Sequence, residues 1–137
     1  MKKIYILLSV VLFLASCSPN PKTGDVQSEP KSNEPQKVLR HVVLFKFTDA
    51  STPADVKKVE DAFGALKGKI NLIKDYEWGT NSSPENLNQG LTHCFFVTFH
   101  SDKDRDEYLV HPDHQAFVEV LKPYLDKVTV IDYWANK

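Results

Sequence analysis

The side chains best suited to proton transfer or metal binding in this 137-residue chain are its five histidines. His111 and His114 are three residues apart, a spacing at which two imidazoles on one helix face can share a metal ion. Pro112 separates them, however, and His111 is better placed to cap a helix that begins at Pro112. A metal site is therefore only a remote alternative, and we predict none.

Two further histidines lie within alternating apolar segments. His41 is in phase with Val43 and Phe45, and His93 is in phase with Phe95. Both imidazoles should face the interior, where each needs a hydrogen-bonding partner. The simplest interpretation of both is a core histidine whose ring nitrogens are satisfied.

Of the two cysteines, Cys17 follows a basic pair and the apolar run at residues 4–14. That run is shorter than the ~20 residues that span a bilayer as a helix, and the small residues before the cysteine complete an export signal. Leu14–Cys17 resembles a lipobox, in which the thiol receives diacylglycerol before cleavage. We therefore predict a lipoprotein signal peptide at residues 1–17. Lipid on Cys17, including palmitate, would then anchor the chain to the bacterial membrane. An ordinary secretory signal is the alternative.

Serine, not aspartate, follows the lipidated cysteine. Aspartate at that position commonly retains lipoproteins in the inner membrane of Gram-negative bacteria. In such a host we therefore expect the outer membrane of the cell envelope, without indication of which face.

Composition changes after the signal. Residues 18–37 hold four prolines and one aliphatic side chain, which predicts a disordered linker, whereas residues 38–137 have the size and apolar content of one domain. Cys94 is the only cysteine besides Cys17, so no intrachain disulfide can form, and its apolar strand context favours a core residue over a nucleophile. The net charge of −1 becomes more negative when Lys2 and Lys3 leave with the signal, which argues against a nucleic-acid partner.

Hydrophobic spacing and capping residues divide the domain into strands and helices. The predicted elements are a strand at 39–47, a helix from Pro53 to Gly68, a strand carrying Ile70, Leu72, Tyr76 and Trp78 in one phase, a loop at 79–90, a strand at 92–100, helices at 101–109 and from Pro112 to near Pro123, and a strand at 128–134. This order predicts an α+β fold in which a ferredoxin-like four-stranded antiparallel sheet carries its helices on one face.

The second face of that sheet is also apolar. In the third strand Phe95 and Phe99 point one way, whereas Cys94 and Phe96 point the other. Helices can cover only one of the two sets. Pairing with an identical subunit, sheet against sheet, is the simplest way to bury the second set, so we predict a homodimer.

Five motifs, in this order, resemble the stress-responsive dimeric α/β barrel (Dabb) family. They are Arg40–Phe47, Tyr76–Gly79, Gly90–Phe99, Tyr108–His114 and Ile131–Tyr133. The resemblance covers essentially all of residues 38–137. It implies the ferredoxin-like, dimeric α+β barrel that the packing argument reaches separately.

For function, the resemblance implies less. Most members have no established activity, but a plant member closes a polyketide chain by aldol condensation without a cofactor. Its reactive pair corresponds to Tyr108 and His114 here, and two further pocket histidines correspond to His41 and His93. His114 would then remove a proton next to a carbonyl, and the Tyr108 hydroxyl would stabilise the enolate. No cofactor is implied.

Two functional classes remain open. In the one we favour, a homodimeric binding module holds a small apolar or aromatic molecule near the membrane, in a pocket formed by His41, His93, Phe45, Phe95 and Trp78. The alternative is a cofactor-free lyase or cyclase, but an exported lipoprotein would not normally meet a cytoplasmic polyketide thioester. A third class is a purely structural protein without a pocket, in which His114 lies at the surface and Tyr108 is a core aromatic.

Overall fold

The computed structural model describes residues 37–136. The predicted signal peptide, the lipidation of Cys17 and the linker up to residue 36 lie outside the described residues. Within 37–136, no helix is long and apolar enough to cross a membrane.

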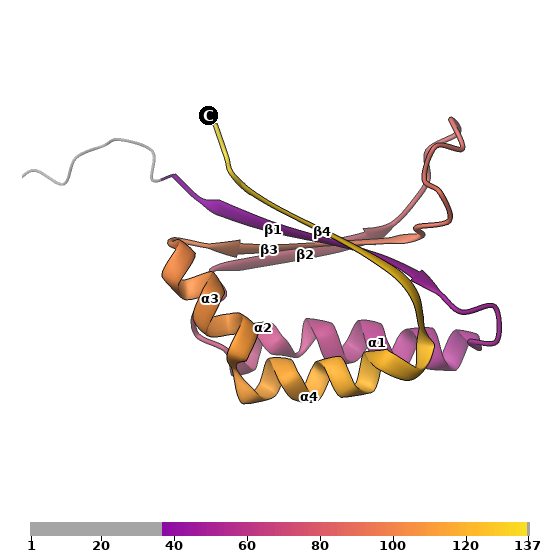
Figure 1. Cartoon of the computed structure of the whole chain (residues 1–137), viewed down its shortest axis with the longest axis horizontal. Coiled ribbons are helices and arrows are strands. Elements are labelled where there is room, and N and C mark those ends of the chain that lie inside the picture. Colours follow the sequence, from indigo (N-terminus) through magenta and orange to yellow (C-terminus); the bar gives the residue numbers. More distant parts are fainter. Residues whose placement is uncertain (1–36, 137) are drawn as a thin grey trace, which may run out of the picture. The chain divides into compact units, whose positions relative to one another are not determined.

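Four antiparallel strands form a single sheet in the order β2-β3-β1-β4. The strands are β1 (Leu39–Phe47), β2 (Asp75–Thr80), β3 (His93–Phe99) and β4 (Leu125–Trp134). Figure 1 shows the helices together on one face of this sheet. The predicted ferredoxin-like arrangement is therefore confirmed.

The first helical segment begins at a capping box. In α1 (Pro53–Gly64) the backbone N–H of Asp55 donates to Thr52 Oγ1 at 3.3 Å, and the Thr52 N–H donates to Asp55 Oδ2 at 2.9 Å. Val59 and Phe63 are buried against the sheet. The short helix α2 (Leu66–Lys69) then continues the same layer.

A break at Pro112 separates the other two helices. The hydroxyl of Ser101 accepts a hydrogen bond from the Asp104 N–H at 3.0 Å and begins α3 (Asp102–Val110). His111, in an extended conformation, ends α3 and caps α4 (Pro112–Leu121), where its Nδ1 accepts from the Asp113 N–H at 3.2 Å. The 3₁₀ helix η1 (Lys122–Tyr124) leads into β4. The change of direction between α3 and α4 brings residues from both helices to the same part of the core.

The core on the helix side is largely aromatic. Phe63 of α1 stacks on Phe95 of β3 at 4.6 Å between ring centroids, and the ring of Phe117 of α4 lies 4.6 Å from that of Phe63. Phe45 of β1 lies 5.1 Å from Phe95. These rings fix the distance between the helices and the sheet.

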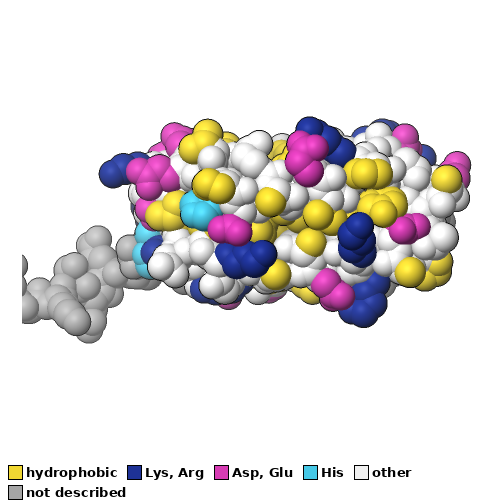
Figure 2. Space-filling view, turned by 90° about the horizontal axis from the view of Figure 1, so that it is seen from below, with side chains coloured by type: hydrophobic (Ala, Val, Ile, Leu, Met, Phe, Trp, Pro, Cys, Tyr) yellow, Lys and Arg dark blue, Asp and Glu magenta, His cyan; other side chains and the backbone are white. Residues whose placement is uncertain are grey.

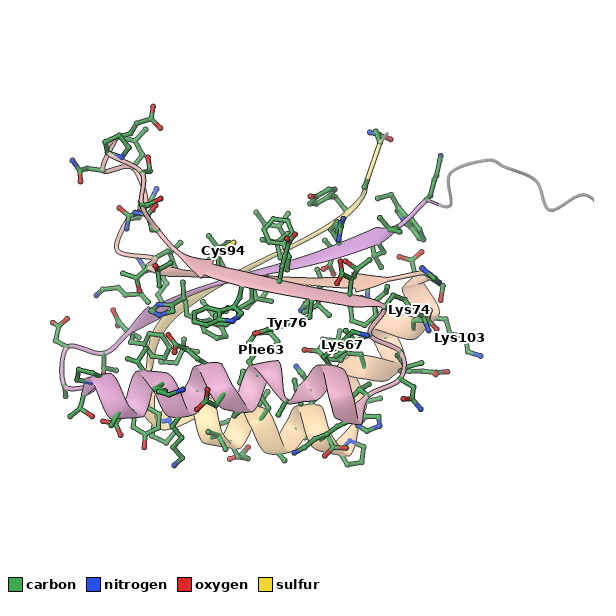
Figure 3. All side chains as sticks on the ribbon, turned by 180° about the vertical axis from the view of Figure 1, so that it is seen from behind. Phe63, Lys67, Lys74, Tyr76, Cys94 and Lys103 are labelled. Atoms are coloured by element: carbon green, nitrogen blue, oxygen red, sulfur yellow. The ribbon has the colours of Figure 1, made fainter. Side chains whose placement is uncertain are left out.

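Figure 3 separates the two faces of the sheet: Phe63 and Tyr76 lie between α1 and the sheet, whereas Cys94 lies on the opposite side. The side without helices carries a row of apolar side chains across the central strands, because Val42 pairs with Phe96 on one side and with Ile131 on the other. Ile131 and Tyr133 are 52% and 44% exposed there. This second apolar face, which we call the open face, comprises Val42, Leu44, Cys94, Phe96, Ile131 and Tyr133.

Two predicted strand boundaries were wrong. The second strand starts at Asp75, because Ile70 and Ile73 are buried three residues apart in the turn after α2 and do not alternate. The last strand starts at Leu125, three residues before the predicted start, because η1 turns directly into the sheet. The first helix also ends earlier, at Gly64, although helical structure resumes up to Lys69.

Candidate functional site

A cavity of about 310 Å³ lies between the sheet and the pair α3 and α4. Its walls are mostly apolar and include Val43, Phe45, Phe63, Phe117, Leu121 and Val130. The half-exposed side chains of Val128 and Val130 mark its opening along β4, the edge strand that the helices leave uncovered. Figure 2 views the helix side, where apolar side chains reach the surface between acidic and basic ones. The cavity is an apolar space that opens at one edge of the sheet.

Tyr108 of α3 lines this cavity and is completely buried. Its hydroxyl has no hydrogen-bond partner among residues 37–136, a state it shares only with the hydroxyl of Tyr76, which does not line the cavity. Burial raises the pKa of the Tyr108 phenol, so the group stays a neutral donor. A buried hydroxyl without a partner is unusual in a folded protein and indicates a position for a ligand atom or an ordered water.

The ring of His114 lies 4.4 Å from the ring of Tyr108, centroid to centroid. Its Nδ1 is 3.1 Å from the carbonyl oxygen of Leu109. A carbonyl oxygen can only accept, so Nδ1 carries the proton and Nε2 offers a lone pair. Burial is the main cause that lowers the pKa of His114, and the nearby His41 and His111 lower it further, against the opposing effect of the Leu109 bond. The imidazole is therefore neutral at pH 7 and able to accept a proton.

His41 lines the same cavity and is 96% buried in a polar group that spans three elements. Its Nδ1 lies 2.7 Å from Asp132 Oδ1 of the neighbouring strand β4, its direct partner in the sheet register. Arg105 of α3 donates to the other oxygen of Asp132. The ring of His41 also packs edge-on against Tyr108 at 5.8 Å. The histidine, carboxylate and guanidinium thus form one connected chain at the wall of the cavity.

The other expected pocket residues lie elsewhere. His93 bonds Thr92 Oγ1 at 2.8 Å through Nδ1 and Glu60 Oε1 at 3.2 Å through Nε2, with Trp78 stacked beside it. Phe95 is fully buried under Phe63 and does not line the cavity. The structure therefore corrects the predicted pocket, because it does not bring His93, Phe95 or Trp78 to the cavity that His41 lines. They share a sheet face with His41, but four residues along β1 separate the His93 row from the His41 row. Phe45 does line the cavity.

A second hollow of about 660 Å³ lies at the other end of the sheet, by the loop between β2 and β3. Trp78, His93, Cys94 and Leu87 contribute to its walls, together with loop amides. It is larger, but both nitrogens of its one histidine are already occupied by Thr92 and Glu60. Burial raises the pKa of the Cys94 thiol, which keeps it protonated and weakly reactive. We therefore place the candidate site in the smaller cavity.

Metal binding has no support in the described part of the chain. His111 uses Nδ1 to cap α4, and no group of three or more His, Cys, Asp or Glu side chains between residues 37 and 136 could hold a metal ion.

Asp132 and Arg105 were not anticipated from the sequence. Asp132 sits between Ile131 and Tyr133, in phase with the inward-facing Val128 and Val130, so a carboxylate at that position was a detectable signal. Arg105 lies among acidic residues on a helix with no clear apolar face, so nothing in its spacing indicated a contact across to β4.

Sequence relatives share most of the domain. The stress-response A/B barrel domain-containing protein HS1 of Arabidopsis thaliana is 39% identical over 95 residues, which is 69% of this chain and 87% of that protein. Olivetolic acid cyclase of Cannabis sativa is 30% identical over 99 residues, covering 72% of this chain and 98% of the cyclase.

Solved structures show the same architecture. A hydroxynitrile lyase from Passiflora edulis matches with a TM-score of 0.70 and 26% identity, covering 75% of this chain and 97% of the lyase. A protein from Bacteroides fragilis, described as dimeric and ferredoxin-like, matches with a TM-score of 0.59 and 26% identity over 72% of this chain and 96% of its own. The model of the stress responsive A/B barrel domain matches residues 39–135. With these motifs, this sheet order and these relatives, the chain belongs to the stress responsive A/B barrel (Dabb) family.

Proposed function

We propose that the protein is a membrane-anchored, homodimeric binding module that holds a small, largely apolar molecule in the cavity beside β4. The observation that carries this proposal is the hydroxyl of Tyr108, which is buried inside an apolar cavity without a partner. A ligand oxygen placed there would satisfy a donor that otherwise carries a desolvation cost. The volume of about 310 Å³ is at the lower end for ligand pockets, so the ligand is small.

Native mass spectrometry of the full chain, purified from the envelope of its host, tests this function. We expect one defined small-molecule adduct per protomer. Phe117→Trp places a larger side chain in the cavity, which reduces its volume and should remove the adduct. Val110→Trp, at a position 74% exposed on α3, should retain the adduct. An adduct that survives Phe117→Trp unchanged would show that the molecule binds elsewhere, and an unliganded wild type would count against a binding module.

A second candidate is a cofactor-free enzyme, favoured by the geometry of His114. Its neutral Nε2 can take a proton from a hydroxyl or from carbon beside a carbonyl, and the neighbouring Tyr108 hydroxyl can donate to the oxygen that becomes negative. Two similar proteins are named as enzymes, an olivetolic acid cyclase and a hydroxynitrile lyase.

Cyanide release from mandelonitrile is a direct assay for the lyase form of this chemistry. The base would take the hydroxyl proton, the carbon–carbon bond to the nitrile would break to leave an aldehyde, and the same proton would pass to cyanide. Turnover that is lost in His114→Gln but kept in His100→Gln, an exposed position, would favour the enzyme. Equal rates in both variants would argue against His114 as the base.

The homodimer is supported by the open face, which exposes Ile131 and Tyr133, and by similar structures described as dimeric. A partner placed sheet against sheet would bury this surface and complete a barrel.

Anchoring rests on the lipobox that ends at Cys17. We propose lipid on this cysteine and, in a Gram-negative host, location at the outer membrane. Cys17→Ser should move the protein out of the membrane fraction and remove the lipid mass from its N-terminal peptide. An unmodified Cys17 in wild type would contradict the proposal.

A further inference from the structure

We propose that the cavity selects molecules that bring hydroxyl hydrogens, such as phenols and alcohols, over isomers that offer only acceptor oxygens. This inference rests on the binding function proposed above and adds the chemical class of the ligand. The selectivity follows from which ring nitrogen carries the proton in His41 and in His114, and the neighbours of each ring decide this.

His41 is fixed in one tautomer by Asp132. The carboxylate can only accept, and its Oδ1 lies 2.7 Å from His41 Nδ1, so Nδ1 carries the proton. The guanidinium of Arg105 occupies the other carboxylate oxygen and stays charged at every working pH. In the neutral ring, the remaining nitrogen of His41, Nε2, then carries a lone pair.

His114 is fixed in the same tautomer by a different partner. Its Nδ1 donates to the carbonyl oxygen of Leu109, so its Nε2 also carries a lone pair. Neither Nε2 takes part in a hydrogen bond within the described part of the chain, and both rings line the cavity beside Tyr108.

The oxygens of Asp132, which also lines the cavity, are paired with His41 and Arg105, so the polar groups left for a ligand are two acceptor nitrogens and one hydroxyl. A ligand with a hydroxyl can donate to an imidazole while it accepts from Tyr108. A ligand with only acceptor atoms can use the Tyr108 hydroxyl but leaves both imidazole nitrogens without a donor. Sites built to hydrogen-bond a hydroxyl reject analogues that lack it, so we expect at least about tenfold discrimination.

Arg105 acts as a positioning residue that makes this pattern testable. In Asp132→Asn, the amide oxygen should face Arg105, which can only donate, and the amide N–H should face His41. Nδ1 of His41 would then have to accept, and its proton would move to Nε2, as happens when the carboxylate of a catalytic triad is replaced by an amide. One acceptor of the cavity becomes a donor.

The experiment uses two isomers of equal composition, 4-propylphenol and 4-ethylanisole, with the full-length chain. Calorimetry measures both affinities, and ring-nitrogen NMR reports each histidine tautomer. We expect wild type to prefer the phenol at least about tenfold, with the proton on Nδ1 of His41 and His114. Asp132→Asn should move the His41 proton, leave His114 unchanged and reduce the preference. The matched control Asp126→Asn, on the same strand and paired with Lys46, should change neither.

Equal affinities for the two isomers would overturn the hydroxyl selectivity while leaving the binding function supported. A wild-type His41 with its proton on Nε2 would overturn it independently of any ligand or variant. Failure of both isomers to bind, with both tautomers as inferred, would instead count against the binding function.

Discussion

The hydroxyl of Tyr108 illustrates how one unpaired atom can indicate function. It is enclosed by apolar side chains, and within residues 37–136 it has no partner. Leaving a buried donor unpaired costs about 1–3 kcal/mol. The hydroxyl of Tyr76 is unpaired as well, but of the two only that of Tyr108 lies at a cavity beside two imidazoles.

Replacing this tyrosine should separate stability from binding. Tyr108→Phe removes the unpaired hydroxyl, so the free energy of unfolding should stay unchanged or rise by about 1 kcal/mol, measured by urea titration. Binding of 4-propylphenol should weaken at the same time. Tyr76→Phe is the matched control, because it removes the other unpaired hydroxyl away from the cavity and should leave binding unchanged. A clear loss of stability in Tyr108→Phe would mean that the hydroxyl has a partner in the folded protein.

His114 should make the protein less stable in mild acid. Burial lowers its pKa in the folded state below the ordinary 6.5, so the unfolded chain binds the proton more readily. The stabilisation is complete above about pH 6.5 and is lost as the pH falls from there through the lower folded-state value. In urea titrations from pH 8 to 5, His114→Gln should flatten this part of the decline. His100→Gln, at an exposed position just after β3, should follow the wild-type curve.

Individual residues were predictable to different degrees. The inward phase of His41 was readable from its alternation with Val43 and Phe45, and the structure buries its ring. The resemblance to the family singled out Tyr108 and His114, and the structure brings the two rings together. The group of Asp132 and Arg105 was missed because it depends on strand register and on a contact between α3 and β4, and single-sequence periodicity reports neither.

At the scale of elements, the break at Pro112 decides the geometry of the site. A continuous helix would place positions 108 and 114 on different faces, because six residues correspond to about one and two-thirds turns. The extended conformation at His111 lets α3 present Tyr108, and α4 present His114, to the same cavity.

The start of α3 should matter for the stability of this arrangement. Ser101→Ala removes the acceptor for the Asp104 N–H and should lower the free energy of unfolding by about 1 kcal/mol. Ser101→Asp keeps a capping oxygen and should retain most of the stability. Equal losses in the two variants, measured by thermal and urea unfolding, would mean that the hydroxyl contributes through something other than the cap.

Element types were readable because capping residues and apolar spacing agreed with each other. Thr52 with Asp55, and Ser101 with Asp104, begin helices as predicted. The start of β2 was misjudged because the spacing of Ile70, Leu72 and Tyr76 also fits a strand. Burial of Ile73 against the core overrides that local pattern, and a tertiary effect of this kind cannot be read from the strand itself.

At the scale of the whole molecule, the open face is the feature that one chain alone does not explain. Ile131 and Tyr133 expose apolar surface beside Val42 and Phe96 on the side without helices. The alternation of both phases in β3 had indicated this surface, but the register that lines it up across three strands became visible only in the structure.

A charge on the open face should disrupt the proposed dimer. Ile131→Lys would bury an unpaired ammonium group between two sheets, so sedimentation equilibrium of the full chain should show a monomer where wild type is a dimer. Val110→Lys, at an exposed position on the helix side, should remain dimeric. A wild-type monomer, or a dimer in both variants, would mean that the open face is not the interface.

The place of β1 in the sheet also determines how the domain carries a mechanical load. β1 is hydrogen-bonded on both sides, to β3 and β4, and just before it the Val38 carbonyl accepts from the Ala135 N–H at 2.9 Å. A pull from the proposed anchor at Cys17 would enter the domain at this end and run along the strand, across bonds that lie perpendicular to it. Two ladders would then share the force in shear, so the domain would resist unfolding under that pull, whereas a pull on an edge strand would let the sheet unzip one bond at a time.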